Sequence, residues 1–259
     1  MTEDMYSVKP LPAFTDNYIW LLETSDRRCV VVDPGESGPV LTELNSRNLK
    51  LEAILLTHHH GDHVGGVRDI LARFPVPVYG SADSRVPFID RPVKDGERIQ
   101  VLGETFLVIA IPGHTLDHIA FFSETPVPRL FCGDTLFAAG CGRIFEGTAE
   151  QMHTSLNKLS RLPDSTEIYC AHEYTLSNLR FALSLEPDNS LLLQRFAQCQ
   201  ELRSRNQPTL PSRLDLERAT NPFLRSDDPV LQAAVQQSGA SANSALEVFT
   251  QVRRLKDSF

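Results

Sequence analysis

A run of histidine and aspartate residues directly after a strand-like segment most constrains how this chain can fold. Residues Ala53–Thr57 form a short apolar run typical of a buried strand, and the sequence HHHGDH follows at once. Alternate residues of an extended chain point to the same side, so we expect His58 and His60 to face one way. Asp62 and His63 follow at the turn into a helix and can aim at a second point. The fold must therefore bring a strand end to a polar site.

These four residues are all of metal-ligand type. Four ligands within six residues exceed what one tetrahedral ion needs when it also takes distant ligands, which favours two ions. The alternatives are a solvated polar loop or a run like a purification tag. A tag would lie at a terminus and would lack the interleaved aspartate.

Three more residues of ligand type follow other strand-like runs. His114, Asp134 and His172 each lie within three residues of the end of an apolar run. Each of them alone is typical of an ordinary loop or capping residue. Together they repeat one arrangement, which favours a shared site at one edge of the sheets.

The pattern of apolar residues along the chain changes near residue 173. Before it, strand-like and helix-like runs alternate, which predicts an α/β fold. After it, β-branched runs disappear and stripes at helical spacing follow, such as Leu176, Leu179 and Leu183. We expect an α/β part followed by a helical part.

Composition excludes several classes of protein. The apolar fraction of 41% with 22% charged residues is ordinary for a soluble globular chain, and no stretch approaches the roughly 18 apolar residues of a membrane span. The net charge of −8 disfavours a nucleic-acid partner. The N-terminus is polar and acidic, unlike a signal or transit peptide. Five cysteines without a CxxC pair suit free thiols, so we expect a cytoplasmic protein without membrane or nucleic-acid partners.

The segments THHHGDH, PGHT, CGDT and AHEYT, in this order, resemble the metallo-β-lactamase superfamily. GCGR at 140–143, HEYT at 172–175 and the basic stretch at 253–257 narrow the resemblance to the hydroxyacylglutathione hydrolases, known as glyoxalase II. The resemblance covers essentially the whole chain. It implies a four-layer αβ/βα sandwich in residues 1–173 and a helical, glutathione-binding domain in residues 174–259.

The resemblance also implies a binuclear metal site. The ligands carry over as His58, His60 and His114 for one ion, Asp62, His63 and His172 for the other, and Asp134 as the bridge. Imidazole and carboxylate ligands without thiolate suit several metals, so we expect Zn²⁺, with Fe²⁺ and Mn²⁺ as alternatives.

The implied activity is hydrolysis of the thioester S-D-lactoylglutathione, and of S-2-hydroxyacylglutathiones in general, to glutathione and D-lactate, the second step of methylglyoxal detoxification. Two ions lower the pKa of a shared water from about 15.7 to roughly 7, so the expected nucleophile is a metal-bridging hydroxide. Asp62 or Asp134 could accept its proton. The thiolate leaves readily, because the pKa of a thiol is about 8.5.

The substrate contacts implied by the resemblance are Arg143, Phe145, Tyr174, Arg253 and Lys256. From the sequence alone, Arg253 and Lys256 share a helix face, and they could equally complement the dipole of a helix C-terminus. Phe145 departs from the family, because some members have tyrosine there, and loss of that hydroxyl predicts weaker substrate binding.

Other residues have no implied role as ligands. Asp117 stands where the family usually has glycine, and it adds a negative charge close to His114. We expect His59 to support a ligand or to be solvated, and His118 has no assigned place. Cys141 is expected to be a small residue in a tight turn, because no neighbouring base would activate it as a nucleophile.

Four other functions fit the sequence less well. A persulfide dioxygenase shares the scaffold and uses one iron, but it normally lacks the long helical extension. A β-lactamase would be exported, and an RNA-processing nuclease should be basic. A metal-free binding module predicts lost ligands, whereas all seven are present. Without heptads or an obvious apolar patch, a monomer is expected.

Overall fold

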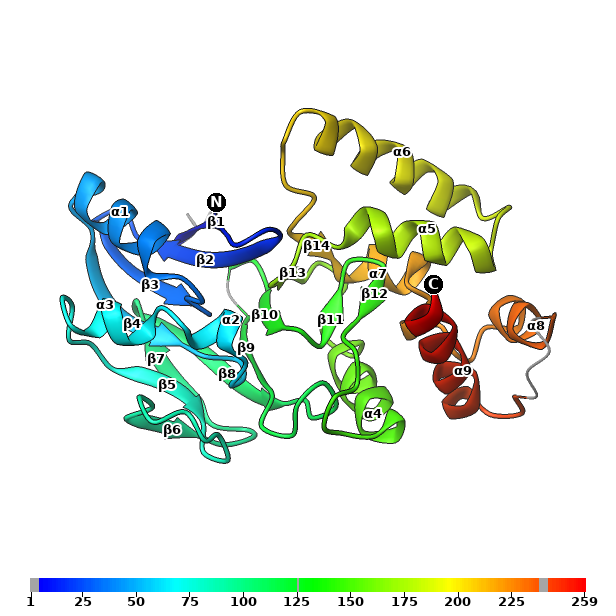
Figure 1. Ribbon diagram of the computed structural model, residues 1–259, viewed down its shortest axis with the longest axis horizontal. Coiled ribbons are helices and arrows are strands. Elements are labelled where there is room, and N and C mark those ends of the chain that lie inside the picture. Colours follow the sequence, from blue (N-terminus) through cyan, green and yellow to red (C-terminus); the bar gives the residue numbers. More distant parts are fainter. Residues whose placement is uncertain (1–4, 125, 238–241) are drawn as a thin grey trace. The chain divides into compact units, whose positions relative to one another are not determined.

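The structure is a computed structural model that describes residues 5–124, 126–237 and 242–259. The chain divides into two compact units (Figure 1). Unit 1 takes the chain up to Ala110 together with Asp117–Gly133, and unit 2 takes Ile111–Leu116 together with the chain from Asp134 onward. The units are described separately below.

Unit 1 is built on a sheet that mixes antiparallel and parallel strands. Its strands, in spatial order, are β1 (Ser7–Ala13), β2 (Asn17–Glu23), β3 (Arg28–Val32), β4 (Lys50–Leu55), β5 (Val78–Ser81) and β6 (Arg91–Val93). The pairs β1–β2 and β2–β3 are antiparallel, and those from β3 to β6 are parallel. Parallel neighbours require crossover connections, and the helices of unit 1 lie in those connections.

Three helices occupy the crossovers of unit 1. They are α1 (Ser37–Arg47), α2 (Gly61–Val64) and α3 (Val67–Leu71). Val40 and Leu44 of α1 and Ile70 of α3 are buried in one cluster with Val31 and Ile54 of the sheet. This cluster is the apolar core between the helices and one face of the sheet (Figure 1).

A second group of strands packs on the other face. β7 (Arg98–Val101), β8 (Glu104–Ala110), β9 (Ile119–Ser123) and β10 (Arg129–Gly133) pair antiparallel in chain order. The ring centroids of Tyr6, which precedes β1, and Phe106 of β8 are 6.1 Å apart, and those of Phe106 and Phe131 are 6.4 Å apart. Unit 1 is therefore layered as helices, sheet and sheet.

Unit 2 is mainly helical. Its strands are β11 (Leu136–Phe137) paired with β12 (Gly140–Cys141), and β13 (Glu167–Cys170) paired with β14 (Ser212–Arg213). Its helices are α4 (Ala149–Leu159), α5 (Thr175–Leu185), α6 (Ser190–Ser204), α7 (Leu214–Thr220), the 3₁₀ turn η1 (Pro222–Leu224), α8 (Pro229–Gln237) and α9 (Ala245–Ser258).

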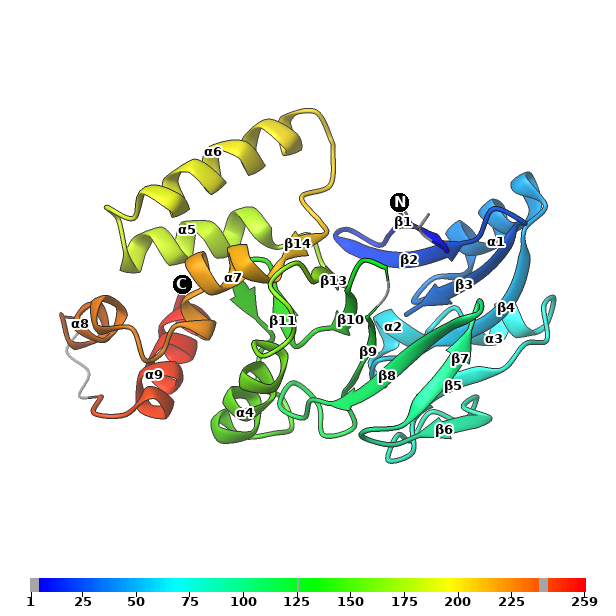
Figure 2. The ribbon, with the colours of Figure 1, turned by 180° about the vertical axis from the view of Figure 1, so that it is seen from behind.

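The helices of unit 2 begin and pack as their sequences dictate. Capping boxes at Thr148 and Ser244 start α4 and α9 by satisfying backbone amides of the first turn. Helices α5 and α6 run side by side (Figure 2). Leu179, Leu192 and Cys199 are buried between them. The predicted α/β class and helical C-terminal part are confirmed. Within the described residues, no helix has both the length and the apolarity needed to cross a membrane.

Candidate active site

The histidine cluster of unit 1 gathers where β4 leads into α2. Nε2 of His58 lies 3.1 Å from Nδ1 of His60, so these two residues face one another as their spacing predicts. The ring centroids of His58 and His63 are 4.1 Å apart, and Nε2 of His63 lies 3.5 Å from Oδ2 of Asp62. The four residues therefore form one concentration of imidazole and carboxylate groups.

A buried aspartate outside the predicted ligand set supports this cluster. Asp33 follows β3 and accepts hydrogen bonds from the amide of Thr57, at 2.8 Å, and from its hydroxyl, at 2.7 Å. Its Oδ2 also lies 3.0 Å from Nδ1 of His63. A carboxylate at Nδ1 fixes the proton on that nitrogen, so Nε2 keeps the lone pair that a metal needs. The signal in the sequence was an aspartate directly after a buried strand.

Asn17 and Gly35 hold the start of α2. The side-chain amide of Asn17 donates to Oδ2 of Asp62 at 3.0 Å. A Cβ on Gly35 would lie 1.8 Å from the carbonyl oxygen of Asp62, so only glycine permits this close approach. Neither role is visible in the sequence, because each residue acts on a partner that is distant along the chain.

The two unassigned histidines have definite partners in unit 1. Nδ1 of His59 lies 2.8 Å from Oδ1 of Asp117. The ring of His118 stacks on that of His58, with centroids 4.5 Å apart and planes 14° from parallel. The aspartate at position 117 therefore gives His59 a carboxylate partner that glycine could not supply.

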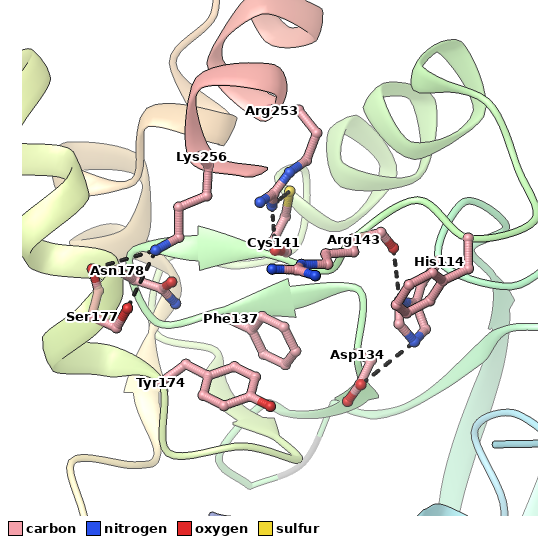
Figure 3. Close-up of a pocket in the computed structure, with 11 residues that line it drawn as sticks. His114, Asp134, Phe137, Cys141, Arg143, Tyr174, Ser177, Asn178, Arg253 and Lys256 are labelled. Atoms are coloured by element: carbon pink, nitrogen blue, oxygen red, sulfur yellow. Dashed lines mark hydrogen bonds and ion pairs between the residues drawn. The ribbon is translucent and has the colours of Figure 1, made fainter. Parts of the chain in front are cut away.

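In unit 2, residues from three strand ends meet. Oδ2 of Asp134, after β10, lies 3.5 Å from Nε2 of His114 and 3.2 Å from Nε2 of His172, which follows β13. All three side chains are buried. Nδ1 of His114 donates to the carbonyl oxygen of Arg143 at 2.7 Å, which leaves Nε2 toward Asp134 (Figure 3). The repeated strand-end pattern thus brings these three residues together.

The donor groups fit a divalent metal of borderline softness. The seven predicted ligands offer imidazole nitrogens and carboxylate oxygens, which suit Zn²⁺, Fe²⁺ and Mn²⁺. Cys170 lies two residues before His172, but burial raises the pKa of its thiol to about 12. Among the described residues, the groups of ligand-type side chains close enough to share an ion include no cysteine, so the donor set has no thiolate.

Unit 2 contains a cavity of about 360 Å³ beside its metal-type residues (Figure 3). All five residues predicted to contact the substrate line it, and two of the predicted ligands do so as well. The seven are His114, Asp134, Arg143, Phe145, Tyr174, Arg253 and Lys256.

Two of the three cations at this cavity are anchored. Arg253 of α9 is buried, donates to the carbonyl oxygen of Cys141 at 2.8 Å and pairs with Asp257 at 2.9 Å. Nζ of Lys256 lies 3.4 Å from the carbonyl oxygen of Ser177. Burial, together with the charges of Arg253 and Arg143, lowers the pKa of Lys256. Both α9 side chains reach the cavity, so they do more than complement a helix end.

Aromatic rings line the cavity next to the histidines. The ring of Tyr174 stacks on His172 at 4.7 Å, and the edge of Phe137 meets Tyr174 at 5.4 Å. Phe145 is 62% exposed and lies 5.2 Å from the ring of His114. These rings give an apolar wall close to the metal-type residues.

Cys141 lies in β12, and the expectation that it occupies a tight turn was wrong. The turn lies before β12, at Ala138 and Ala139, where Ala139 has φ +55°. Burial raises the pKa of the Cys141 thiol to about 11, although the charge of Arg253 opposes the shift. A buried, protonated thiol cannot act as the nucleophile, as expected.

Comparison with known proteins agrees with this architecture. Residues 13–172 match the model of the metallo-beta-lactamase superfamily, and residues 173–259 match that of the hydroxyacylglutathione hydrolase C-terminus. The chain is 51% identical over 256 residues to hydroxyacylglutathione hydrolase 2 of Vibrio vulnificus, and 53% identical over 259 residues to a hydroxyacylglutathione hydrolase of Pseudomonas putida. Each match covers 98% of this chain and 100% of the relative.

A solved structure shows the same fold at lower identity. The B3 metallo-beta-lactamase BLEG-1 is 24% identical, with a TM-score of 0.64, over 85% of this chain and 99% of that one. With its histidine and aspartate groups, the chain binds divalent metal. From its matches along the full length, this chain belongs to the hydroxyacylglutathione hydrolases, within the metallo-beta-lactamase superfamily.

Proposed function

We propose that this chain is a metal-dependent thioester hydrolase that converts S-D-lactoylglutathione, and other S-2-hydroxyacylglutathiones, to glutathione and the free 2-hydroxy acid. D-lactate would be the product of the second step of methylglyoxal detoxification. The observation that carries the proposal is the cavity of unit 2, in which three cations and two metal-type residues line the same space. The names of its relatives indicate the same substrate class.

Two divalent ions per chain, most simply Zn²⁺, are proposed to be held as the family resemblance implies. The proposed ligands are His58, His60 and His114 for one ion, Asp62, His63 and His172 for the other, and Asp134 shared between them. When bound, such ions supply Lewis acidity and a water of lowered pKa. The remaining chemistry belongs to the residues of the chain.

The cations select glutathione. Glutathione carries two carboxylates, and Arg143, Arg253 and Lys256 provide guanidinium and ammonium groups at one cavity. Charge-assisted hydrogen bonds of this kind are stronger than neutral ones and fix orientation. Because Arg253 is already held by Cys141 and Asp257, it loses little freedom on binding substrate.

Other residues of the cavity orient the thioester. His114 cannot turn freely, because its Nδ1 is bonded to the carbonyl of Arg143. Tyr174 and Phe145 provide the apolar surface against which the acyl group and sulfur pack. A carboxylate oxygen of Asp134 or Asp62 accepts the proton released in hydrolysis, and the glutathione thiolate leaves without a general acid because the pKa of its thiol is about 8.5.

The setting follows from the composition. We place the enzyme in the cytoplasm, because thiols such as its five free, buried cysteines stay reduced there. The net charge of −8 argues against a nucleic-acid partner. We also expect no membrane partner, and a monomer because the sequence has no heptads or obvious apolar patch. Residues 1–173 are proposed as the catalytic domain and residues 174–259 as the glutathione-binding domain.

The test is hydrolysis of S-D-lactoylglutathione by metal-replete protein and by two variants. Asp134→Ala should abolish turnover. Arg253→Ala/Lys256→Ala should raise KM by at least about tenfold, since a hydrogen bond to a charged group contributes about 1.5–3 kcal/mol. Absence of turnover by folded wild-type protein that carries two metals would discard glutathione thioesters as substrates.

A further inference from the structure

A buried carboxylate behind the substrate cavity has no role in the proposed chemistry. Glu217 of α7 is fully buried and is not among the residues that line the cavity. One of its oxygens, Oε1, accepts from Arg195 and Ser212. Arg195 is itself 4% exposed, so this is an ion pair removed from water. Such a pair is costly to bury, and its other contacts show what it holds.

The second oxygen of Glu217 holds the β11–β12 hairpin. Oε2 accepts from the amide of Ala139, at 2.8 Å, and from the side-chain amide of Asn221, at 3.0 Å. Ala139 lies in the turn of the hairpin, with φ +55°. The same side-chain amide of Asn221 also donates to the carbonyl oxygens of Phe137 and Gly140, at 3.1 and 3.0 Å.

The hairpin needs this support. Its strands are two residues long and pair only as Leu136 with Cys141 and Phe137 with Gly140. An isolated two-stranded hairpin is marginally stable even when it is longer. Yet Phe137 and Cys141 line the cavity, and the carbonyl of Cys141 anchors Arg253. Figure 3 shows Phe137 and Cys141 of the hairpin at the same cavity as Arg143 and Arg253.

We propose that Glu217 is a positioning residue for substrate binding, which acts through the hairpin without touching the substrate. Its carboxylate fixes the turn at Ala139, the turn fixes the carbonyl of Cys141, and that carbonyl orients Arg253. The identity of the ligand in this proposal rests on the proposed function. The position of the hairpin does not.

Glu217→Gln is the diagnostic variant, because it nearly preserves volume. A glutamine has one acceptor oxygen, whereas donors surround both oxygens of Glu217. The positive charge of Arg195 attracts the one remaining oxygen of the glutamine. The new NH₂ group then faces the donors of Ala139 and Asn221. The hairpin then loses its acceptor, whereas Arg195 and Ser212 keep theirs.

Glu186→Gln is the matched control. Glu186 is also buried and pairs with Arg225 through both oxygens, at 2.7 and 3.0 Å. Its side chain also accepts from Asn189, and these two partners lie at helix ends of unit 2 and not in the hairpin. It should lower thermal stability to a similar degree without affecting the cavity.

Three measurements decide the proposal: amide exchange of residues 136–143, the Kd of glutathione by calorimetry, and KM and kcat for the thioester with metal content. We expect Glu217→Gln to speed exchange of the Ala139 amide at least tenfold and to raise Kd and KM about tenfold. The values of kcat and the metal content should stay within twofold of the wild type. Glu186→Gln should change neither the exchange nor KM.

Unchanged exchange and Kd in folded Glu217→Gln protein would overturn the proposal, as would an equal effect of Glu186→Gln. A large loss of metal would also overturn it, because Glu217 would then act on the metal site. If the wild type binds glutathione but hydrolyses no thioester, the proposed function fails, and exchange with Kd still decides the role of Glu217.

Discussion

The histidine ligands proposed for this site are oriented by oxygen atoms at their second ring nitrogen. Nδ1 of His63 meets the carboxylate of Asp33, and Nδ1 of His114 meets the carbonyl of Arg143. Both arrangements direct Nε2 toward the carboxylate side of the respective cluster. Orientation of a ligand by such partners matters for metal affinity nearly as much as the ligand itself.

Asp33→Asn should therefore weaken metal binding by about 10- to 100-fold without removing a ligand. The amide keeps the shape of the carboxylate but presents an NH₂ group to either Thr57 or His63, both of which donate to it in the native protein. Competition with a chromophoric chelator measures the effect. The control is Asp69→Asn, because Asp69 is an exposed residue of α3. Equal metal affinities of the two variants would contradict a role of Asp33 in orienting His63.

Lys256 gives the cavity a pH dependence. Burial and two neighbouring guanidinium groups lower its pKa below the ordinary 10.5. The ammonium binds a carboxylate only while protonated, so affinity is retained at low pH and is lost as pH rises through the lowered pKa. The Kd of S-methylglutathione, measured by calorimetry across alkaline pH, should rise earlier than an ordinary lysine would cause.

Lys256→Arg separates this effect from titration of the ligand, because the guanidinium stays charged over the whole range. The variant should lose the alkaline rise attributable to position 256 and keep the part that comes from the amino group of the ligand. Identical profiles for the two proteins would show that Lys256 does not contact the carboxylate.

Cys141→Ala should leave kcat within about twofold. With a thiol pKa of about 11, roughly one molecule in a thousand carries the thiolate at pH 8, so nucleophilic attack by this residue is negligible. The backbone carbonyl that anchors Arg253 is retained. Steady-state kinetics check this, and a loss of several orders of magnitude in kcat would return Cys141 to the list of catalytic groups.

At the residue scale, the sequence predicted the ligand types and missed their partners. Histidines and aspartates after strand-like runs are visible locally, so His114 and Asp134 could be selected without a structure. Asp33, Asn17 and Glu217 act on residues far along the chain. Their roles depend on which segments the fold brings together, and a single sequence does not contain that information.

At the scale of elements, local pattern predicted the strands that lead into the ligand-type residues, and two segments that it did not predict have physical causes. β1 contains Pro10 and Pro12, which interrupt a strand pattern in the sequence. The structure tolerates them because β1 is at the edge of its sheet, where an amide can be missing without breaking the ladder. The β11–β12 hairpin has no local signal, because side chains of Asn221 and Glu217 hold it.

Helix α4 positions the loop that carries His114. Ser155 of α4 donates to the carbonyl of Pro112 at 2.7 Å, and a Cβ on Gly113, where φ is +155°, would lie 2.8 Å from Cα of Met152. Gly113→Ala should therefore reduce the free energy of unfolding by about 1–3 kcal/mol through overpacking and should also weaken metal binding. Denaturant titration and metal competition measure the two effects.

The control for this substitution is Gly38→Ala, since a Cβ at Gly38 of α1 meets nothing within 4 Å. There alanine should be neutral or stabilise the helix by up to about 1 kcal/mol. A stability loss of the same size at both positions would mean that the contact between α4 and the His114 loop is unimportant.

At the scale of the whole molecule, the sequence predicted where helical segments replace β-rich ones. It did not predict how packing divides the chain into two compact units. Helices do replace β-rich segments near residue 173, as the loss of β-branched runs indicates. The compact units instead separate at Gly133 and Asp134, and the six residues Ile111–Leu116 belong to unit 2. A short segment can pack away from its neighbours in sequence, and periodicity does not report such packing.

Metal should contribute to the stability of the folded chain. An ion that binds only the native state stabilises it by mass action, by about 2.7 kcal/mol when free metal is at one hundred times its Kd. We expect a chelator to lower the unfolding temperature, and titration with Zn²⁺ to restore it at two equivalents per chain. Calorimetry with metal analysis checks both the temperature and the number.

The number of equivalents separates the competing functions, because each needs a different metal content. Asp134→Ala removes the proposed shared ligand, so it should bind less metal and recover less of the lost stability, whereas Asp69→Asn should behave as the wild type. Recovery at one equivalent would favour a mononuclear centre, as in the dioxygenase alternative. If the chain bound no metal and the chelator left its unfolding temperature unchanged, the assignment as a metal-dependent hydrolase would be contradicted. The imidazole and carboxylate groups would then serve only to stabilise the fold.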